Sequence, residues 1–483
     1  GTVTGVQTCA LPIWNMNYPN KGNNMISLAD QAKNLISSLG NLADYLEIRF
    51  EDRQALQIML NEKGVRGISR SNRVGGCIRA CYKGGWGFAS FADLSRMKAL
   101  SMEAIQMART VGTSSTRLAQ IKPIVDHVPL HIIKDPRETS ISDKISKLDH
   151  YRELMLGRQP ELVKAIGLSY QEEFLEKTLL TSEGTHISQA SMELGLSYNA
   201  RALLNGQQTM MFGVTGSTDD FEFLQGLDEN VMAICDQAAL YSKAPKIRGG
   251  VYTVVLDPEL AGVFAHESFG HTSEADLFAE KPGGLDTLKI GKRFGTDELN
   301  IYDTGLLKGR AGDSKYDDEG VPTHHTDLIK EGILVGRMHN RETAASLHEE
   351  PTGNARAMNY HFPPIVRMRN TCIGPGKHEV EDLFRDIKEG VYALGCYGGS
   401  GGEQFSFSAL RGYMIRDGKI AEPVKGLSLM GNLFETLGNI EGIGPASDLQ
   451  QLSGMCGKHA QFPLSVSMRS PHIRIRNLTI GGY

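Results

Sequence analysis

Three stretches in the first half of the chain have the hydrophobic spacing of amphipathic helices. Apolar residues recur every three or four positions from Ser27 to about Gly40, where the glycine supplies a stop. The same spacing returns in residues 92–111 and 143–158, and a fourth helical stretch covers residues 228–244. These patterns predict helices that cover one face of a larger structure.

The segments between these helices alternate apolar and polar residues with period two, as strands do. The first strands are expected at residues 45–52, 55–60, 65–71 and 76–91. Later hairpins are expected to turn at Glu183-Gly184 and Asn205-Gly206, because a residue followed by glycine favours a tight turn. The first half therefore predicts a domain made of helices and an antiparallel sheet.

The second half reads differently, because strand patterns dominate it. Residues 243–250 form a basic joint containing Pro and Gly, and residues 251–256 then read as a buried strand. Asp257 can cap a helix that has Pro258 at its first position. Beyond this helix most segments predict strands, and no period of 20–50 residues repeats. We expect an α+β protein whose C-terminal domain is β-rich and barrel-like and carries this helix.

Length and composition refine this picture without changing its class. A chain of 483 residues exceeds one hydrophobic core, so we expect an N-terminal domain at residues 25–242 and a C-terminal domain at residues 243–483. No window approaches the roughly 18 apolar residues of a membrane span, which predicts a soluble protein. Lys and Arg number 51 against 56 Asp and Glu, and no basic block stands out. Nucleic acid is therefore not expected as a direct ligand.

The cysteines indicate the cellular compartment of the protein, and the first residues of the sequence indicate where the natural chain starts. Seven cysteines are scattered without short spacings, which is typical of reduced thiols in the cytoplasm. Residues 3–13 resemble a translated sequencing adapter, so residues 1–24, including Cys9, are treated as a non-native or disordered leader. The start is expected at Met16 or Met25.

The candidate chemistry lies on the helix of the second half. His266, Glu267 and His271 resemble the zinc-peptidase motif H-E-x-x-H with one residue added. On a regular helix a spacing of five would turn the two rings about 140° apart, too far for one tetrahedral metal. The alternative is structural: Glu267 and His271 form a surface ion pair while His266 makes a backbone contact. Gly270 favours the metal, because glycine permits a π-type bulge in which five residues cover one turn.

A zinc site of this kind needs a third protein ligand from elsewhere. The candidates are Glu274, Asp276, His324, His325, the pair Cys77 and Cys81, and Cys456. His324 and His325 lie in an expected hairpin that points them to opposite faces, and the paired cysteines are better explained as apolar core residues. Cys456 is expected in a non-periodic loop beside glycines and a lysine, where packing gives little reason for a thiol.

Several segments together resemble a known family. They are AHESFGHTSEAD, YDDEGVPTHHTDLIKEGIL, PTGNARAM, MRNTCIGPG, EQFSFSALRGYMIRDGKI, GMCGKHAQFP and RIRNLTIGG. In this order they are similar to the TldD/PmbA family of modulator-of-gyrase metallopeptidases, over roughly residues 25–483. The resemblance implies that His266, His271 and Cys456 bind Zn²⁺ and that Glu267 is the catalytic base.

The motif also distinguishes the two kinds of chain in that family. A PmbA-like (TldE-like) chain lacks the metal motif and acts as a partner, so this chain resembles the catalytic TldD-like kind. It departs from many TldD chains after the second histidine, where TSEAD replaces a Gly-Leu-Glu-Gly-Asp type of sequence. Glu274 and Asp276 still correspond, so the difference concerns the shape of the adjoining substrate cleft.

The expected function is a zinc-dependent peptidase that hydrolyses unfolded or extended peptides. The resemblance implies a homodimer or a heterodimer with a PmbA/TldE-like subunit. Charge and hydropathy predict neither nucleic acid nor a membrane as a direct partner. Two alternatives remain: a non-catalytic regulatory or partner subunit, and a zinc amidohydrolase of small molecules. The glycine-rich residues 397–405 are either a wall of the substrate cleft or a plain turn, since no Lys-Ser/Thr and helix follow to make a phosphate loop.

Overall fold

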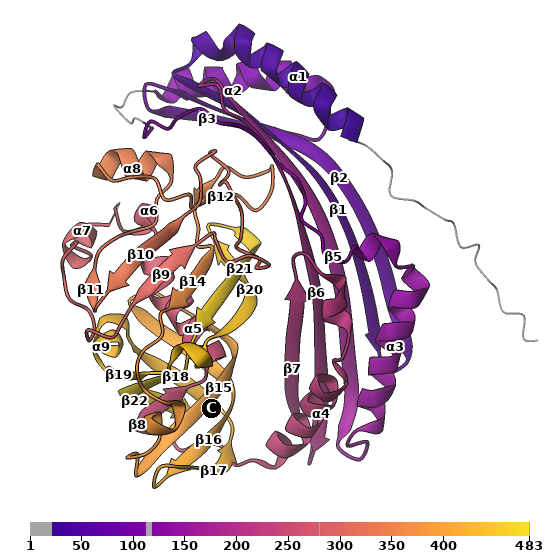
Figure 1. Cartoon of the computed structure of the whole chain (residues 1–483), viewed down its shortest axis with the longest axis vertical. Coiled ribbons are helices and arrows are strands. Elements are labelled where there is room, and N and C mark those ends of the chain that lie inside the picture. Colours follow the sequence, from indigo (N-terminus) through magenta and orange to yellow (C-terminus); the bar gives the residue numbers. More distant parts are fainter. Residues whose placement is uncertain (1–21, 113–117, 280, 483) are drawn as a thin grey trace, which may run out of the picture.

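The structure is a computed structural model that describes residues 22–112, 118–279 and 281–482. A long curved sheet from the first half arches over a second, strand-rich unit from the second half (Figure 1). The predicted α+β class is therefore confirmed. The predicted leader, including Cys9 and Met16, lies almost wholly outside the described residues, and Met25 falls in the first helix. Within the described ranges, no helix is both long enough and apolar enough to span a membrane.

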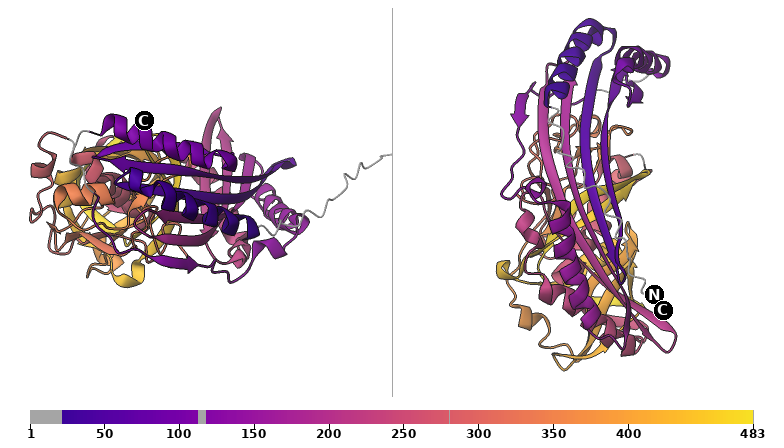
Figure 2. Two further views of the ribbon diagram at one scale, coloured as in Figure 1. Left: turned by 90° about the horizontal axis from the view of Figure 1, so that it is seen from above. Right: turned by 90° about the vertical axis from the view of Figure 1, so that its right-hand side faces the viewer.

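The N-terminal unit is one sheet of seven strands in the order β3-β2-β1-β5-β6-β4, with β7 also paired to β6. Its strands are β1 (Tyr45–Asn61), β2 (Gly64–Tyr82), β3 (Gly85–Phe91), β4 (Val125–Val128), β5 (Val163–Thr181), β6 (His186–Leu204) and β7 (Gln207–Ser217). Its α-helices are α1 (Gly22–Leu39), α2 (Met97–Val111), α3 (Ile141–Gly157) and α4 (Asp228–Lys243). Helices α1 and α2 pack at one end of the sheet, and α3 and α4 pack near the other (Figures 1 and 2).

Two of the predicted strand breaks are wrong. Residues 45–52 and 55–60 belong to the single strand β1. Residues 65–71 are the first part of β2, which continues without a break to Tyr82. The polar stretch that suggested a break stays in register with β2 on one side and β5 on the other. The turn at Asn205-Gly206 is confirmed, with left-handed φ angles of 49° and 78°. Continuous hydrogen bonding thus outweighs the local loss of alternation.

Buried ion pairs join the curved sheet to the second unit. Arg79 on β2 approaches Glu319 to 2.5 Å, and both side chains are buried. Arg341, which is fully buried, makes a two-pronged contact with Glu183 at 2.7 and 2.8 Å. Charges removed from water need such partners, so these pairs fix where the two units meet.

The C-terminal unit contains a closed ring of five strands and a second, mixed sheet. The ring order is β15-β8-β22-β18-β16, and β15 pairs back to β16. The ring strands are β8 (Gly250–Leu256), β15 (Glu389–Ser400), β16 (Gln404–Arg416), β18 (Leu427–Asn432) and β22 (Ile473–Gly482), with β17 (Lys419–Val424) and β19 (Ile440–Ile443) attached outside. The expected barrel-like domain is therefore confirmed.

The second sheet runs β11-β10-β9-β14-β21-β20, so β20 is an edge strand. Its strands are β9 (Ile301–Thr304), β10 (His325–Lys330), β11 (Ile333–Leu334), β14 (Asn370–Ile373), β20 (Gln450–Lys458) and β21 (Gln461–Ser470), and the short β12 (Ala355–Arg356) pairs separately with β13 (Ile365–Val366). Short helices α6 (Ala275–Phe278), α7 (Gly284–Thr287), α8 (Arg341–Leu347) and α9 (Leu433–Gly438) connect these parts.

One helix lies between the ring and this sheet. It begins with α5 (Pro258–Phe264), where the Asp257 side chain accepts from the Leu260 N–H at 2.8 Å, as the sequence predicted. It continues as the π-helical segment η5 (Ala265–Gly270). The His271 N–H donates to the carbonyl oxygen of His266, five residues earlier. The bulge expected near Gly270 is therefore present.

Gly270 is also constrained by packing. A Cβ at this position would lie 2.1 Å from the sulfur of Met368, which is fully buried. Glycine therefore lets η5 approach the segment leading into β14 more closely than any other residue would.

The substitution Gly270→Ala is expected to lower the free energy of unfolding by about 1–3 kcal/mol, because the added methyl overpacks the core. Chemical denaturation measures this change, with Gly157→Ala as the control, since no atom lies within 4 Å of a Cβ there. Combining Gly270→Ala with Met368→Ala should cost less than the sum of the single changes. Wild-type stability in Gly270→Ala would show that the close approach is not a constraint.

Candidate functional site

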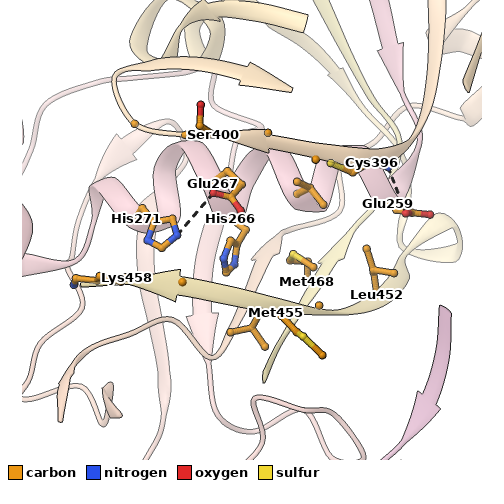
Figure 3. A pocket seen from close by; sticks show the side chains of 18 of the residues that line it. Glu259, His266, Glu267, His271, Cys396, Ser400, Leu452, Met455, Lys458 and Met468 are labelled. Atoms are coloured by element: carbon orange, nitrogen blue, oxygen red, sulfur yellow. Dashed lines mark hydrogen bonds and ion pairs between the residues drawn. The ribbon is translucent and has the colours of Figure 1, made fainter. Parts of the chain in front are cut away.

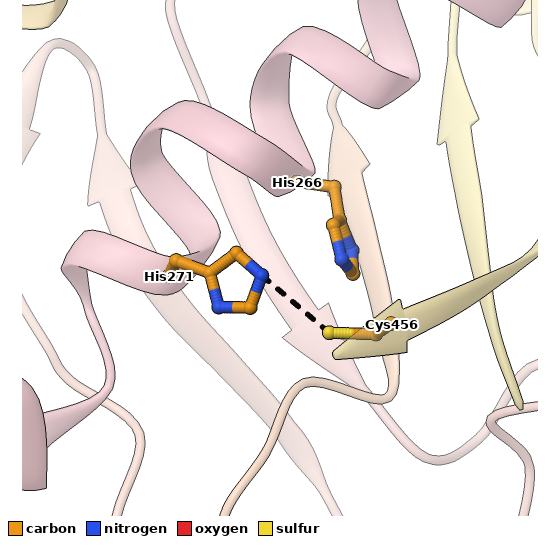
Figure 4. Close-up of side chains that lie close together, drawn as sticks. All are labelled: His266, His271 and Cys456. Carbon is orange, nitrogen blue, oxygen red and sulfur yellow. Dashed lines mark hydrogen bonds between the residues drawn. The ribbon is translucent and has the colours of Figure 1, made fainter. Parts of the chain in front are cut away.

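His266, His271 and Cys456 come together although the third residue is far away in sequence. The π-helical segment η5 carries His266, His271 follows it directly, and Cys456 lies on the edge strand β20 (Figures 3 and 4). The nitrogen and sulfur atoms that could bind a metal all lie within 4.8 Å of one another. Among the described residues, this is the one cluster of three or more potential ligands of this kind.

The geometry of these atoms fits one tetrahedral ion. The Cys456 sulfur lies 3.5 Å from His271 Nε2, and the two imidazole centroids are 5.3 Å apart with planes at 79°. Zinc bonds of about 2.0–2.3 Å in a tetrahedron place neighbouring ligand atoms about 3.3–3.6 Å apart. His266 Nδ1 is buried, and no hydrogen-bond partner for it occurs in the described part of the chain. Two imidazoles and a thiolate form a donor set typical of zinc.

The orientation of His271 is set by a buried carboxylate. His271 Nδ1 lies 2.9 Å from Glu274 Oε2, which leaves Nε2 facing the cysteine sulfur. Lys458 Nζ lies 3.2 Å from the same carboxylate oxygen and 2.6 Å from Asp276 Oδ1. A carboxylate behind a histidine is the usual arrangement that fixes a metal-binding tautomer.

The same contacts explain the protonation of the site. Burial raises the pKa of the Cys456 thiol, but hydrogen bonds from His266 and His271 outweigh this effect and lower the pKa to about 5. Burial lowers the pKa of His271, but Cys456 and Glu274 overcome it and raise the pKa to about 10. A sulfur held as thiolate is the form in which cysteine binds a metal.

Glu267 lies beside the cluster and not in it. Its Oε2 is 3.8 Å from His271 Nε2, and its side chain is 27% exposed. A Cβ on Gly401 would lie 1.8 Å from the backbone oxygen of Glu267, so the glycine-rich hairpin packs directly on this turn. The carboxylate is therefore held next to the potential metal position while remaining open to a ligand.

The cluster opens into a large cavity between the two units. The cavity has a volume of about 1220 Å³ and includes His266, Glu267 and His271 in its wall. The N-terminal unit contributes β7 and α4, and the C-terminal unit contributes β20 and the glycine-rich hairpin. Residues 398–403 line the cavity, and residues 401–403 connect β15 to β16.

The other sequence candidates for a third ligand lie elsewhere. His324 and His325 are both exposed, and His325 pairs with Asp327 at 2.8 Å. Cys77 and Cys81 are buried on β2 and are free thiols. Glu274 and Asp276 face Lys458, and Glu274 supports His271 from behind.

The expectation of a non-periodic loop around Cys456 is wrong. Residues 450–458 form β20, in which Cys456 and Lys458 point to the buried face while Met455 and Gly457 are exposed. Glycines weakened the strand pattern, and antiparallel pairing with β21 supplied the regularity that the local sequence lacked.

Two supporting residues were missed in the sequence. Arg367 donates to the backbone oxygens of Cys456 and Gln461 at 2.9 and 3.2 Å, and Lys458 joins two carboxylates. The sequence signal for Lys458 was its position two residues after Cys456, because residues two apart lie on the same face of a strand. The sequence offers no comparable signal for Arg367.

Comparisons with known proteins agree over most of the chain. Residues 46–110, 134–244 and 249–482 match the models of the PmbA/TldA metallopeptidase domain 1, central domain and C-terminal domain. The chain is 41% identical over 462 residues to a metalloprotease of Synechocystis, covering 95% of this chain and 99% of the relative. It is 31% identical to the zinc metalloprotease TldD homolog of Saccharolobus solfataricus, covering 91% and 97% of the two chains.

The fold is also that of a solved structure. The crystal structure of TldE from Thermococcus kodakarensis matches with a TM-score of 0.76 at 18% identity, over 93% of this chain and 99% of that chain. At this low sequence identity, the similarity shows a shared fold and carries no conclusion about function. The three matched domain models and the relative that is 41% identical over nearly its full length show that the chain belongs to the PmbA/TldD family of metalloproteases.

Proposed function

We propose that the chain is a zinc-dependent peptidase that hydrolyses unfolded or extended peptides, with His266, His271 and Cys456 as the zinc ligands. The observation that carries the proposal is the convergence of these three side chains within 4.8 Å, at the wall of a large cavity that His266 and His271 line. The name of the Saccharolobus relative, which includes zinc, supports the choice of metal. The donor set of two imidazoles and one thiolate does so on chemical grounds.

The residues around the ligands have separate tasks in this proposal. His266, His271 and Cys456 would hold the zinc ion, which would supply Lewis-acid chemistry for attack of water on a peptide carbonyl. Glu267 takes the proton of the attacking water and returns it to the leaving amine, as a base beside the ligands can do. Glu274 and Lys458 keep His271 in the tautomer that presents Nε2.

The shape of the cavity favours an extended polypeptide. Strand β20 is the edge of its sheet, and residues 452–455 of it line the cavity beside the cluster. An edge strand can hydrogen-bond the backbone of an added strand without reading its side chains. The volume of about 1220 Å³ exceeds the roughly 300–1,000 Å³ of most small-molecule sites, which disfavours a small-molecule amidohydrolase.

Assembly and location complete the proposal. We propose a pair of subunits, either two copies or one copy with a PmbA/TldE-like chain, and a cytoplasmic location without a direct nucleic-acid or membrane partner. The family membership supports the pairing. The cysteines of the described part are all free, which is in keeping with a reducing compartment.

Glu267→Gln is expected to keep the metal and lose hydrolysis. The amide has nearly the shape of the carboxylate but cannot take a proton, so the loss in kcat should be about 10²-fold or more. Cleavage of an unfolded polypeptide, measured beside zinc content, tests this. If the Glu267→Gln variant holds about one zinc per chain and keeps full activity, only the role of Glu267 is refuted. If the wild-type protein shows no cleavage that a chelator inhibits, the peptidase function itself is refuted.

Cys456→Ser is expected to abolish stoichiometric zinc, because a serine hydroxyl does not replace a thiolate. Glu274→Gln should weaken zinc affinity by about 10–100-fold through the loss of support for His271. Competition with a chromogenic chelator measures both. Cys396→Ser is the matched control, since Cys396 lines the same cavity but lies outside the cluster. Equal zinc affinity in Cys456→Ser and Cys396→Ser would contradict the ligand assignment.

A further inference from the structure

The cavity continues past the candidate zinc ligands to a second polar end. Helix α5 runs along its wall, with Glu259 seven residues before His266 (Figure 3). At about 1.5 Å per residue this places Glu259 about 10 Å from the ligands along the helix. The proposed mechanism uses none of the residues at this end.

Glu259 is a poorly partnered carboxylate. Its one hydrogen bond within the described chain is from the Cys396 N–H to Oε1 at a long 3.4 Å, and no ion pair reaches it there. Burial and the neighbouring Asp257 raise the pKa of Glu259, and Arg411 partly opposes them without direct contact. Asp257 itself is occupied by the N–H groups of Leu260 and Gly395. Two carboxylates, Glu259 and Asp257, thus stand against one guanidinium, Arg411, which also lines the cavity but makes no ion pair with Glu259 in the described chain.

A second acceptor comes from the N-terminal unit. Gln237 on α4 lines the same cavity, and its amide oxygen is buried without a hydrogen-bond partner in the described part of the chain. Tyr198 on β6 also lines the cavity, and burial raises the pKa of its hydroxyl, with a smaller contribution from the charge of Glu259. Buried acceptors without donors are costly, and a ligand that brings N–H groups would satisfy them.

We propose that Glu259, assisted by Gln237, binds a positively charged group of the peptide substrate about three residues from the cleaved bond. The spacing follows because an extended peptide advances about 3.3 Å per residue, so about 10 Å corresponds to three residues. The group is a Lys or Arg side chain or a free N-terminal amine, which share the same N–H donors and charge. This inference rests on the proposed peptidase function and names its preferred substrate class.

Peptide binding tests the subsite independently of hydrolysis. The protein is the zinc-loaded Glu267→Gln variant, and the probes are acetylated, amidated ten-residue peptides of neutral sequence with one Lys or one norleucine. Fluorescence anisotropy should give about tenfold tighter binding of the Lys peptide, the range of a charge-assisted hydrogen bond. A third probe with norleucine and a free N-terminal amine distinguishes the two sources of charge.

Variants at Glu259 and a matched glutamate decide where the preference comes from. Added to Glu267→Gln, Glu259→Gln should remove the difference between the Lys and norleucine peptides, and Glu259→Lys should favour a Glu peptide instead. Gln237→Leu should reduce the difference. Glu403→Gln should leave the difference intact, since Glu403 is another glutamate in the cavity wall. Melting temperature and zinc content establish that each variant is folded.

Cleavage products of a mixed peptide pool give the position of the group. Mass spectrometry of wild-type products should find Lys, Arg or the free N-terminus enriched about three residues from the cut, and Glu259→Gln should lose that enrichment. Equal binding of the Lys, norleucine and free-amine peptides, or a preference that survives Glu259→Gln, overturns the subsite. Lack of any cleavage by wild type overturns the peptidase proposal instead, because the binding comparison does not require turnover.

Discussion

The site depends on one backbone hydrogen bond that is wider than those of a regular helix. The His271 N–H reaches the carbonyl of His266 five residues back, and this π turn brings the two imidazoles to within 5.3 Å of each other. In a regular helix the same residues would diverge by about 140°. Gly270 makes the turn compatible with the core, because its missing side chain leaves room for Met368.

The cavity also depends on the contact between the two units, because each unit contributes part of its wall. The curved sheet brings β7 and α4 into the wall of the cavity, which β20 and other parts of the C-terminal unit also line. The buried pair of Arg79 with Glu319 and the pair of buried Arg341 with the partly exposed Glu183 hold this arrangement. Removing one partner of such a pair costs about 3–5 kcal/mol, so the contact between the units is specific as well as tight. The cavity is therefore a product of the whole chain.

The site combines rigid and open parts in a way that suits catalysis on a polymer. His271 is fixed from behind by Glu274 and Lys458, and the backbone of Cys456 is held by Arg367. Glu267 is the most exposed of the motif residues, at 27% against 17% for His271. Ligands that do not move keep their geometry through a reaction, while an accessible carboxylate can exchange protons with water and substrate.

Sequence patterns by themselves determined the class of the protein, the four long helices of the first half, the Asn205-Gly206 turn, the capped helix and the candidate residues of the metal motif. These are local properties: helical spacing, the residue types of a cap or turn, and glycine beside a histidine act over a few positions. Tertiary structure decided that the first strands run unbroken and that Cys456 lies on a strand. It also brought the sulfur of Cys456 to the ring of His271, which lies 185 residues earlier in the chain. It also decided which charged residues support the site and that the cavity has a second polar end. The physical reason is that hydrogen bonding between strands and burial of charge depend on neighbours distant in sequence, which no local pattern encodes.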